Sequence, residues 1–413
     1  MPSSPVVIIG AGLSGLACAL RLQQKGVYCQ IFEASNCVGG RVRTNVADGF
    51  LFDRGFQVLL SAYPQTQRTL DYSTLRLKSF LPGALVRFRG RFHQLADPLR
   101  SPAEALPALL SSVASAADKL RIISLRQRVC SPSIPELLKH PEVTTLARLR
   151  EIGFSERTIN HFFRPFLGGI FLERDLVTSS RKFEFIFRMF ALGEATLPAE
   201  GMQAIPQQLA NRLRPSVLRL GVRVASITEG GVQLESGETV KTRRVVVATA
   251  QAEAYRLIGK GPAQPGTSTT CIYYSAERTP VHGPWLVLNG EGAGPINNLC
   301  VLTEVQRTYA PAGTSLISVT VVDPTFQSRA DLELAVRGQL ENWYGPEVAR
   351  WRHLRTDHIA NALPLQAPPS LDPVAKPVKI SERLFVCGDH TTIASIEGAI
   401  TSGQRAADAA ISA

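Results

Sequence analysis

The feature that most constrains this chain is a glycine-rich turn close to its N-terminus. Residues 6–9 read Val-Val-Ile-Ile, a β-branched run that is too short for a helix and typical of a buried parallel strand. The run leads into Gly-Ala-Gly-Leu-Ser-Gly at residues 10–15, and a helical apolar pattern follows over residues 16–25. A second strand is predicted over residues 27–32 and ends on Glu33. This order predicts a βαβ unit that binds a dinucleotide.

The residue types at this turn suit a dinucleotide. Gly10 permits the tight turn, Gly12 lets the backbone approach a pyrophosphate, and Gly15 allows the helix to pack closely. The helix N-terminus offers N–H donors to the phosphates, and Glu33 is placed to accept hydrogen bonds from ribose hydroxyls. The adenosine side is therefore predicted to contact Gly10, Ala11, Gly12, Ser14, Gly15, Glu33 and Ala34. The alternative is a glycine-rich turn that holds no ligand.

A second glycine pair, at residues 39–40, indicates which dinucleotide to expect. It is followed by Arg41 and Arg43, so two flexible backbone positions precede a basic cluster. A nicotinamide dehydrogenase has no use for this arrangement after its ribose acid. A flavin enzyme does, because Gly40 lets the chain pass close to the pyrophosphate and Arg41 offsets the phosphate charge. The sequence therefore predicts FAD.

These stretches resemble the FAD-binding sequences of the flavin amine oxidase and phytoene desaturase clan, which also includes protoporphyrinogen oxidases. Three later motifs match in order. Residues 198–206 are similar to the clan's entry to a return helix, and residues 222–224, with a strand at 245–248, to the segment whose valine backbone meets the adenine. Residues 386–403 are similar to the C-terminal flavin motif. The resemblance covers the whole chain.

The resemblance implies an α/β fold, in which a glutathione-reductase-type, Rossmann-like FAD domain is joined to a discontinuous α+β substrate domain. The expected FAD-binding domain comprises residues 1–70, 191–267 and 375–413. The expected substrate domain comprises residues 71–190 and 268–374.

In the C-terminal motif, the resemblance implies that Asp389 holds the ribityl-pyrophosphate region and that the last helix points its N-terminus at the flavin N1–C2 carbonyl. A helix dipole at that place favours the anionic reduced flavin. The alternatives are a helix-capping role for Asp389 and a purely dipolar role for Glu397. FAD is expected to be non-covalent, because the cysteine that anchors it in some amine oxidases is absent before Glu397. The further predicted cofactor contacts are Gly40, Arg41, Val224, Gly388, Asp389, Ser395, Ile396 and Ala399.

Two positions help to distinguish an amine oxidase from a desaturase within this clan. Amine oxidases carry a flavin-facing lysine on a strand where this chain has Thr270, and an aromatic residue where it has Ser395. The stretch around Ser395, which reads Ala-Ser-Ile-Glu-Gly-Ala-Ile-Thr-Ser-Gly, is instead similar to that of plant- and cyanobacterial-type carotene desaturases.

The leading hypothesis is therefore an FAD-dependent oxidoreductase that desaturates a hydrophobic, isoprenoid or otherwise membrane-soluble substrate. A hydride passes to flavin N5, and oxygen or a quinone serves as the electron acceptor. One alternative is a flavin amine oxidase or protoporphyrinogen oxidase. Another is a flavin-dependent isomerase without net redox change, or a scaffold that FAD stabilises.

Three side chains are candidates for a catalytic role. Arg54 and Gln57 match the position where the clan's chain passes from the cofactor to the flavin-facing strand, and the alternative is a strand-end turn with surface side chains. His390 is predicted to lie near the flavin, where a structural hydrogen bond is favoured over catalysis. Eight phenylalanines are favoured as core, with an apolar tunnel as the alternative: Phe162, Phe163, Phe166, Phe171, Phe183, Phe185, Phe187 and Phe190.

The net charge of +11 is unevenly distributed, since residues 71–190 carry 19 lysines and arginines against 11 aspartates and glutamates. A solvated basic face and attraction to an anionic membrane both fit this bias. Residues 103–128 are predicted to be amphipathic, and residues 91–110 are similar to the membrane-facing region of the desaturases. Peripheral membrane contact through residues 71–190 is therefore expected.

The remaining patterns exclude several classes. No nucleic-acid motif is present, and the seven scattered cysteines form neither a zinc motif nor a disulfide framework, which predicts a reducing compartment and no metal. No leader and no run of 18 apolar residues is found. The expected location is the cytoplasm.

Overall fold

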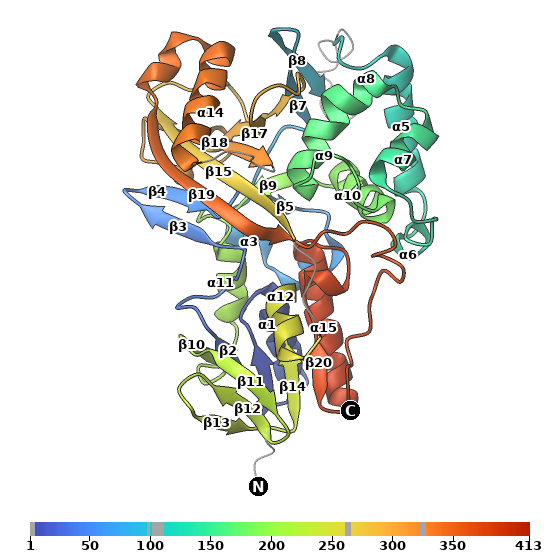
Figure 1. Cartoon of the computed structure of the whole chain (residues 1–413), viewed down its shortest axis with the longest axis vertical. Coiled ribbons are helices and arrows are strands. Elements are labelled where there is room, and N and C mark those ends of the chain that lie inside the picture. The colour runs from blue at the N-terminus through green and yellow to red at the C-terminus, as the bar shows by residue number, and fades with distance from the viewer. Residues whose placement is uncertain (1–4, 97–99, 101–110, 261–265, 323–327) are drawn as a thin grey trace.

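A parallel sheet of five short strands organises the lower part of the computed structural model (Figure 1), in which residues 5–96, 100, 111–260, 266–322 and 328–413 are described. The strand order is β10-β2-β1-β14-β20, and the strands span Leu218–Leu220, Cys29–Glu33, Val6–Ile9, Arg244–Val247 and Leu384–Val386. The sheet joins three distant parts of the chain in parallel register. The predicted α/β class and the predicted N-terminal βαβ unit are confirmed.

Both faces of this sheet are covered, as its continuous apolar strands require. On one face, Ile8 and Ile31 share a core with two long helices, α1 (Leu13–Gln24) and α15 (Ile396–Ser412). On the other face, Val7 and Ile9 pack against a small antiparallel sheet and a short helix: β11 (Val224–Thr228), β12 (Gly231–Leu234), β13 (Thr239–Lys241) and α12 (Gln251–Leu257). Because α1 packs directly on α15, the N-terminal and C-terminal motifs lie side by side.

A seven-stranded mixed sheet dominates the upper part of Figure 1. Its order is β19-β15-β18-β17-β16-β7-β8, and the strands span Arg352–Leu363, Thr267–Ala276, Ser315–Val322, Ile296–Val301, Leu286–Asn289, Gly83–Phe88 and Arg91–Ala96. Helix α14 (Arg329–Tyr344) covers one face, where Ile272 and Tyr274 of β15 are buried. The lower end of β19 and β15 reaches the top of α15 (Figure 1), so this sheet meets the cofactor-side elements there.

Helices form the other half of the upper part (Figure 1). They are α5 (Ala116–Cys130), α6 (Ile134–Leu137), α7 (Thr145–Ile152), α8 (Glu156–Thr158), α9 (Arg164–Phe171) and α10 (Ser180–Leu192), with a π-helical turn over Ile159–Phe163. The predicted amphipathic stretch 103–128 lies partly outside the described residues, and α5 is its described part. No helix in the described ranges is long and apolar enough to span a bilayer.

Short elements link the two parts. They are β3 (Thr44–Ala47), β4 (Phe50–Asp53), β5 (Leu59–Leu60), α2 (Pro64–Thr69), α3 (Tyr72–Leu75), β6 (Lys78–Ser79), β9 (Ala195–Leu197), α11 (Ala204–Ala210) and α13 (Leu302–Val305). The parallel sheet draws on residues from all three segments expected to form the FAD domain. The limits of the two domains stay a prediction.

Candidate cofactor site

The glycine-rich turn, Glu33 and the second glycine pair meet at the upper end of β1 and β2. The Glu33 carboxylate accepts hydrogen bonds from the backbone N–H of Ala11 at 2.7 Å and of Ser35 at 2.8 Å. The Gly39 N–H donates to the Ala11 carbonyl, which lays the second glycine pair beside the first. Val222 N–H donates to the Glu33 carbonyl, which brings the segment leading into β11 to the same corner.

The three glycines of the turn differ in the space around them. A Cβ on Gly15 would lie 2.0 Å from the Gly10 carbonyl oxygen, so that position is closed by the fold itself. A Cβ on Gly12 would meet nothing within 4 Å. The free space at Gly12 therefore lies where a pyrophosphate is predicted to approach the backbone. The close contact at Gly15 lies where close packing of the helix was predicted. Ser14 and Ala11 are buried in the same turn, and Ala34 is exposed at its edge.

Arg41 joins this corner to the C-terminal motif. Its guanidinium donates to the Asp389 carboxylate at 2.6 Å and to the Ala362 carbonyl, at the end of β19, at 2.9 Å. Burial alone would raise the pKa of Asp389, but the charge and hydrogen bond of Arg41 hold the pKa below its ordinary value. Asp389 is thus a buried anion, and it follows Gly388, whose φ of 152° is one that few other residues adopt.

Two buried groups near Asp389 lack partners. Both ring nitrogens of His390 are buried and bind nothing, and burial lowers the pKa of the ring to about 4. Lys182 of α10 is 2% exposed, and its ammonium group lies over the Phe171 ring without a hydrogen bond or ion pair to any described residue. Unpaired buried polar groups are costly, so their gathering at one place indicates a bound polar molecule. These orphaned groups and the open space over Gly12 fit FAD.

Helix α15 begins at Ile396, and Glu397 in its first turn contacts a second helix. The Ser395 hydroxyl caps the helix by accepting from Gly398 N–H at 3.0 Å, while Ile396 and Ala399 lie in the first turn. Glu397 accepts hydrogen bonds from Gln65 N–H and from the N–H and hydroxyl of Thr66. Its carboxylate therefore caps the N-terminus of α2, a contact beyond the dipolar role considered for Glu397.

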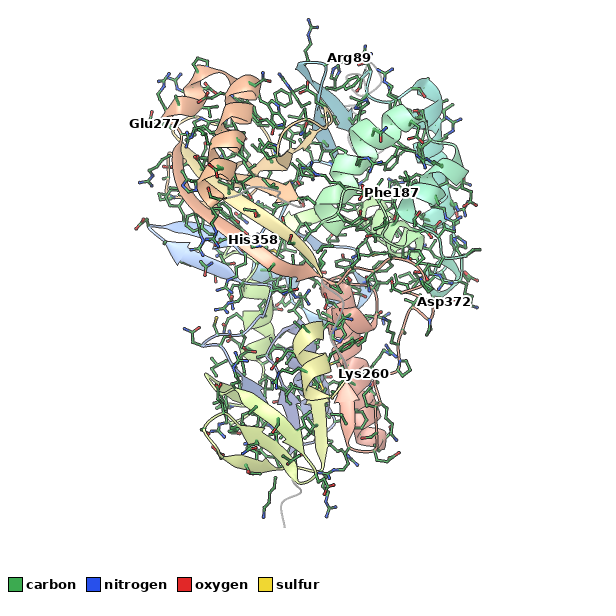
Figure 2. All side chains as sticks on the ribbon, in the orientation of Figure 1. Arg89, Phe187, Lys260, Glu277, His358 and Asp372 are labelled. Carbon is green, nitrogen blue, oxygen red and sulfur yellow. The ribbon has the colours of Figure 1, made fainter. Side chains whose placement is uncertain are left out.

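Strand β15 offers no lysine to the site. Thr270 pairs with His358 of β19, and its hydroxyl lies 3.1 Å from His358 Nδ1 (His358 is labelled in Figure 2). Thr270 shares its face of β15 with the residues under α14. Cys271 and Tyr273 face the core that continues to the cofactor side, and the Tyr273 hydroxyl donates to the Asp53 carbonyl at 2.6 Å. A shift of one residue in the strand would still place no lysine there.

The other catalytic candidates have different surroundings. The Gln57 amide donates to the carbonyls of Arg41 and Arg54, so it holds the Arg41 backbone in place. Arg54 is largely exposed, and partial loss of hydration together with the neighbouring charge of Arg43 lowers its pKa. The structure therefore brings Gln57 to the Arg41–Asp389 pair through backbone contacts, and gives Arg54 an exposed position beside Arg43.

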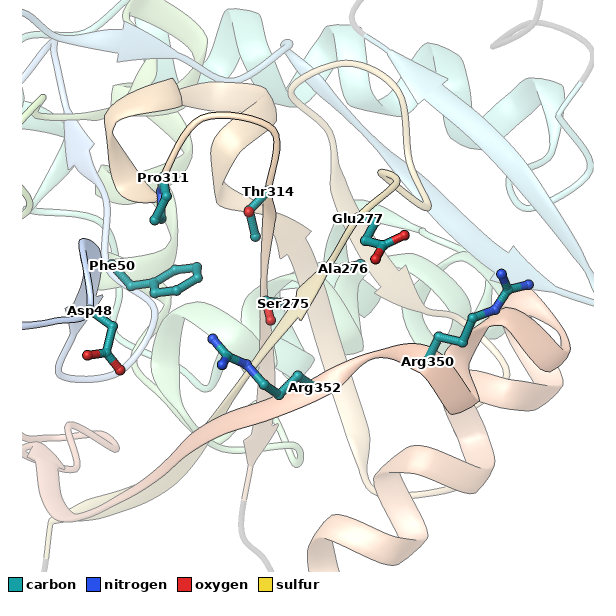
Figure 3. A pocket seen from close by; sticks show the side chains of 9 residues that line it. All are labelled: Asp48, Phe50, Ser275, Ala276, Glu277, Pro311, Thr314, Arg350 and Arg352. Carbon is teal, nitrogen blue, oxygen red and sulfur yellow. The ribbon is translucent and has the colours of Figure 1, made fainter.

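The phenylalanines of the helical half pack on one another. Phe163 contacts Phe154, Phe162 and Phe183 with ring centroids 4.7 to 6.4 Å apart, and Phe183 contacts Phe187, which Figure 2 labels. This is the packing of a core, the favoured interpretation. A cavity of about 430 Å³ lies elsewhere, against β15, β19 and the β3–β4 hairpin (Figure 3). Arg352 extends toward Phe50 in it, whereas Arg350 points away.

Sequence reasoning missed Lys182, Gln366 and Asp53. Gln366 accepts from Ala394 N–H at 2.9 Å and donates to the Thr392 carbonyl at 2.6 Å, so it shapes the loop before α15. Each of these residues is ordinary in its local sequence, and no spacing marks it. Among the described residues, no group of three or more His, Cys, Asp or Glu side chains could hold a metal ion.

Asp53, at the end of β4, should make stability depend on pH. It accepts hydrogen bonds from Met202 N–H at 2.9 Å and from the Tyr309 hydroxyl at 2.8 Å, yet burial raises its pKa from 3.8 to about 6. Between these values the folded state binds more protons than the unfolded state. The free energy of unfolding should therefore fall as the pH rises through this window, by roughly 3 kcal/mol.

Asp53→Asn keeps an acceptor oxygen and has no charge, so it should remove most of this decline. Urea unfolding at pH 4, 5, 6 and 7 measures it. Asp71→Asn, at the exposed start of α3, is the control and should keep the decline. An Asp53→Asn protein with the wild-type pH dependence would show that Asp53 is not its source.

The chain is similar to known proteins in both sequence and structure. The family described as flavin containing amine oxidoreductase matches residues 13–411. Protoporphyrinogen oxidase 2, chloroplastic/mitochondrial, from Arabidopsis thaliana is 26% identical over 164 residues, which cover 40% of this chain and 32% of that protein. Phytoene dehydrogenase from Streptomyces griseus is 25% identical over 401 residues, covering 86% of this chain and 76% of that protein.

The chain thus matches about a third of the length of the Arabidopsis protein. Among solved structures, an oxidoreductase from Methanosarcina mazei has a TM-score of 0.74 and is 18% identical, and the match covers 97% of this chain and 99% of that one. At this identity the likeness concerns the fold, and it agrees with the predicted FAD-binding architecture.

Proposed function

The chain belongs to the family of flavin-containing amine oxidoreductases, and from that premise we propose that it desaturates a hydrophobic, membrane-soluble substrate of the isoprenoid class. It is an FAD-dependent oxidoreductase. The proposal concerns its substrate, the bond that is oxidised and the residues that hold the cofactor.

The observation that carries the proposal is the lining at the predicted flavin end. Strand β15 carries no lysine, and Ser395 is a helix cap that stands where an amine oxidase has an aromatic wall. A desaturase needs mainly a positioned C–H bond and little acid–base chemistry from the protein. The similarity to phytoene dehydrogenase along most of the chain also supports a desaturase.

We assign the cofactor contacts as follows. The backbone around Gly12, together with the N-terminus of α1, binds the pyrophosphate, and Glu33 accepts from the adenosine ribose. Arg41 balances phosphate charge, Asp389 accepts from the ribityl chain, and the first turn of α15 faces the flavin. When bound, FAD supplies the redox chemistry by accepting a hydride from a C–H bond of the substrate. No residue of this chain is assigned a covalent bond to it.

His390 has a limited role in this scheme. Because burial lowers its pKa to about 4, the ring is neutral at neutral pH and has no proton to release as an acid. Its unpaired nitrogens are instead suited to a hydrogen bond with the bound cofactor. This supports the structural interpretation of His390 over a catalytic one.

The surface of α5 supports access from a membrane. Leu120 is 68% exposed and Ile123 is 49% exposed, one turn apart on the helix. Exposed apolar side chains on a helix are suited to the headgroup region of a bilayer. The basic excess is a weaker support, because Arg148, Arg181 and Lys182 are buried rather than at the surface.

The test is anaerobic bleaching of the flavin spectrum by candidate substrates in liposomes. We expect an isoprenoid polyene to bleach the flavin and to gain a conjugated double bond, while a soluble amine does neither. Leu120→Asp with Ile123→Asp should slow the reaction with liposome-borne substrate several-fold or more. Leu334→Asp, at a 69% exposed position on α14, is the matched control and should not.

Other outcomes distinguish the alternatives. Bleaching by a porphyrinogen would favour a protoporphyrinogen oxidase, which the Arabidopsis relative supports. Turnover of amines with release of hydrogen peroxide would favour an amine oxidase. Isomerisation that needs reduced FAD and leaves the redox state unchanged would favour the isomerase. Any of these would overturn the desaturase proposal.

A further inference from the structure

Lys182 is a buried cation whose charge is not matched by the protein. It lies near the start of α10, is 2% exposed, and its Nζ sits 5.3 Å from the centroid of the Phe171 ring. This ring lies against the ammonium group, and within the described part of the chain no hydrogen bond or ion pair reaches that group. A buried ammonium without a partner is strongly unfavourable.

The two carboxylates whose charges act on Lys182, Asp389 and Glu173, already have other partners. Asp389 is paired with Arg41 at 2.6 Å. The Glu173 carboxylate accepts from the N–H groups of Leu176 at 2.6 Å and Thr178 at 3.0 Å. Burial lowers the pKa of Lys182 to about 8 even though Asp389 and Glu173 raise it, so the group is still mostly charged at neutral pH. Among the described residues, neither carboxylate forms an ion pair with Lys182, although the charges of both act on it.

The position of Lys182 is fixed relative to α15. Ser179 N–H, at the start of α10, donates to the Gln366 carbonyl at 2.8 Å. The Gln366 side chain in turn binds both Thr392 and Ala394, in the loop that leads into α15. Lys182 follows Ser179 by three residues. The hydrogen bonds of Gln366 therefore link the start of α10, which carries Lys182, to the loop before α15.

We propose that Lys182 is the counter-charge for the reduced flavin, and so determines how readily the bound cofactor accepts electrons. Two-electron reduction with one proton leaves the flavin ring negative, and this is the charge for which the site holds an unpaired cation. The helix dipole of α15 acts in the same sense. The inference rests on the proposed function only in taking FAD to lie between Arg41, Asp389 and α15.

The experiment compares the affinity of the protein for oxidised and for reduced FAD. Lys182→Met removes the charge at similar size, Lys182→Gln removes it but stays polar, and Lys182→Arg keeps it. We expect both neutral variants to lose affinity for reduced FAD at least ten-fold more than for oxidised FAD. That ratio corresponds to a midpoint potential lower by about 30 mV for a two-electron couple. Lys182→Arg should stay close to the wild type.

Lys241→Met, at an exposed position on β13, is the matched control and should change neither affinity. The unfolding of the FAD-free protein gives a second measurement. Lys182→Met should unfold at the same or a higher urea concentration, because a buried unpaired charge has been removed. Equal loss of affinity for both redox states, or an unchanged midpoint potential in folded Lys182→Met and Lys182→Gln, would overturn the inference.

The outcome also separates this inference from the proposed function. A wild-type protein that binds FAD but is bleached only by soluble amines loses the proposed function and keeps the Lys182 result. A wild-type protein that desaturates a polyene, with neutral variants at the wild-type potential, keeps the function and loses the inference. A wild-type protein that takes up no FAD overturns both.

Discussion

Gly403→Ala should unfold at a markedly lower urea concentration than the wild type and retain little FAD. A Cβ at this position would lie 2.0 Å from the Ser14 carbonyl oxygen and 3.1 Å from Cys18 N. The atoms in the way belong to the backbone of α1, so no side chain can rotate to make room. Overpacking of this kind costs about 1–3 kcal/mol, and more where the backbone must move.

The loss of FAD follows from which helices are forced apart. Helix α1 begins at the glycine-rich turn and α15 at the flavin motif, and the two pack directly on each other. A shift between them moves one half of the cofactor site against the other. Urea unfolding and the flavin absorbance after gel filtration measure the two effects on the same sample.

Gly338→Ala is the matched control for this substitution. Gly338 is an exposed residue within α14, and a Cβ there would meet nothing within 4 Å. Because alanine favours a helix over glycine by about 1 kcal/mol, this variant should be as stable as the wild type or more stable. If Gly403→Ala behaves in the same way, the close contact between α1 and α15 does not exist in solution.

Asp389→Ala should destabilise the FAD-free protein and weaken FAD binding. It removes the anion that pairs with Arg41 and whose charge acts on Lys182, so both cations are left without this carboxylate. Removing one partner of a buried ion pair costs about 3–5 kcal/mol. We expect the lower end, because about a third of the Arg41 side chain stays exposed. The lost acceptor for the ribityl chain should lower FAD affinity roughly ten-fold or more.

Glu156→Ala provides the comparison. Glu156 of α8 pairs with Arg150 of α7 at 2.6 Å, and both side chains are more than half exposed. Exposed pairs contribute about 0–1 kcal/mol, so this variant should unfold close to the wild type and retain FAD. Titration with FAD measures the affinity of both variants for the cofactor, and urea unfolding of the FAD-free proteins measures their stability. Equal behaviour of the two variants would mean that Asp389 is not a buried charge centre.

The sequence was most informative where chemistry is local. The turn at residues 10–15 and the flanking strands could be predicted, because a strand, three spaced glycines and a helix form within one short segment. The second glycine pair was predicted to approach the same pyrophosphate as the first turn, and the hydrogen bond from Gly39 N–H to the Ala11 carbonyl places the two segments side by side. Strand ends were less certain, as in β2, which begins at Cys29 rather than Val27.

Roles that depend on distant partners were harder to predict. Glu397 was expected to act in its own helix, but its carboxylate caps α2, more than 300 residues away. Thr270 could be identified as a departure from the amine oxidase pattern, but which face of β15 it occupies depends on the pairing with β19. The residues next to Glu397 and Thr270 in the sequence indicate neither the partner of Glu397 nor the face that Thr270 occupies.

By itself, the sequence determined the cofactor and the fold class, because the glycines, the ribose acid and the C-terminal motif each work through neighbouring backbone. Only the tertiary structure decided how charge is balanced at the predicted flavin end of the site. Arg41 and Asp389 are 348 positions apart, and Lys182 joins them from a third segment. Whether a buried charge is paired depends on which distant atoms the packing brings within a few ångströms, and no spacing along the chain encodes that.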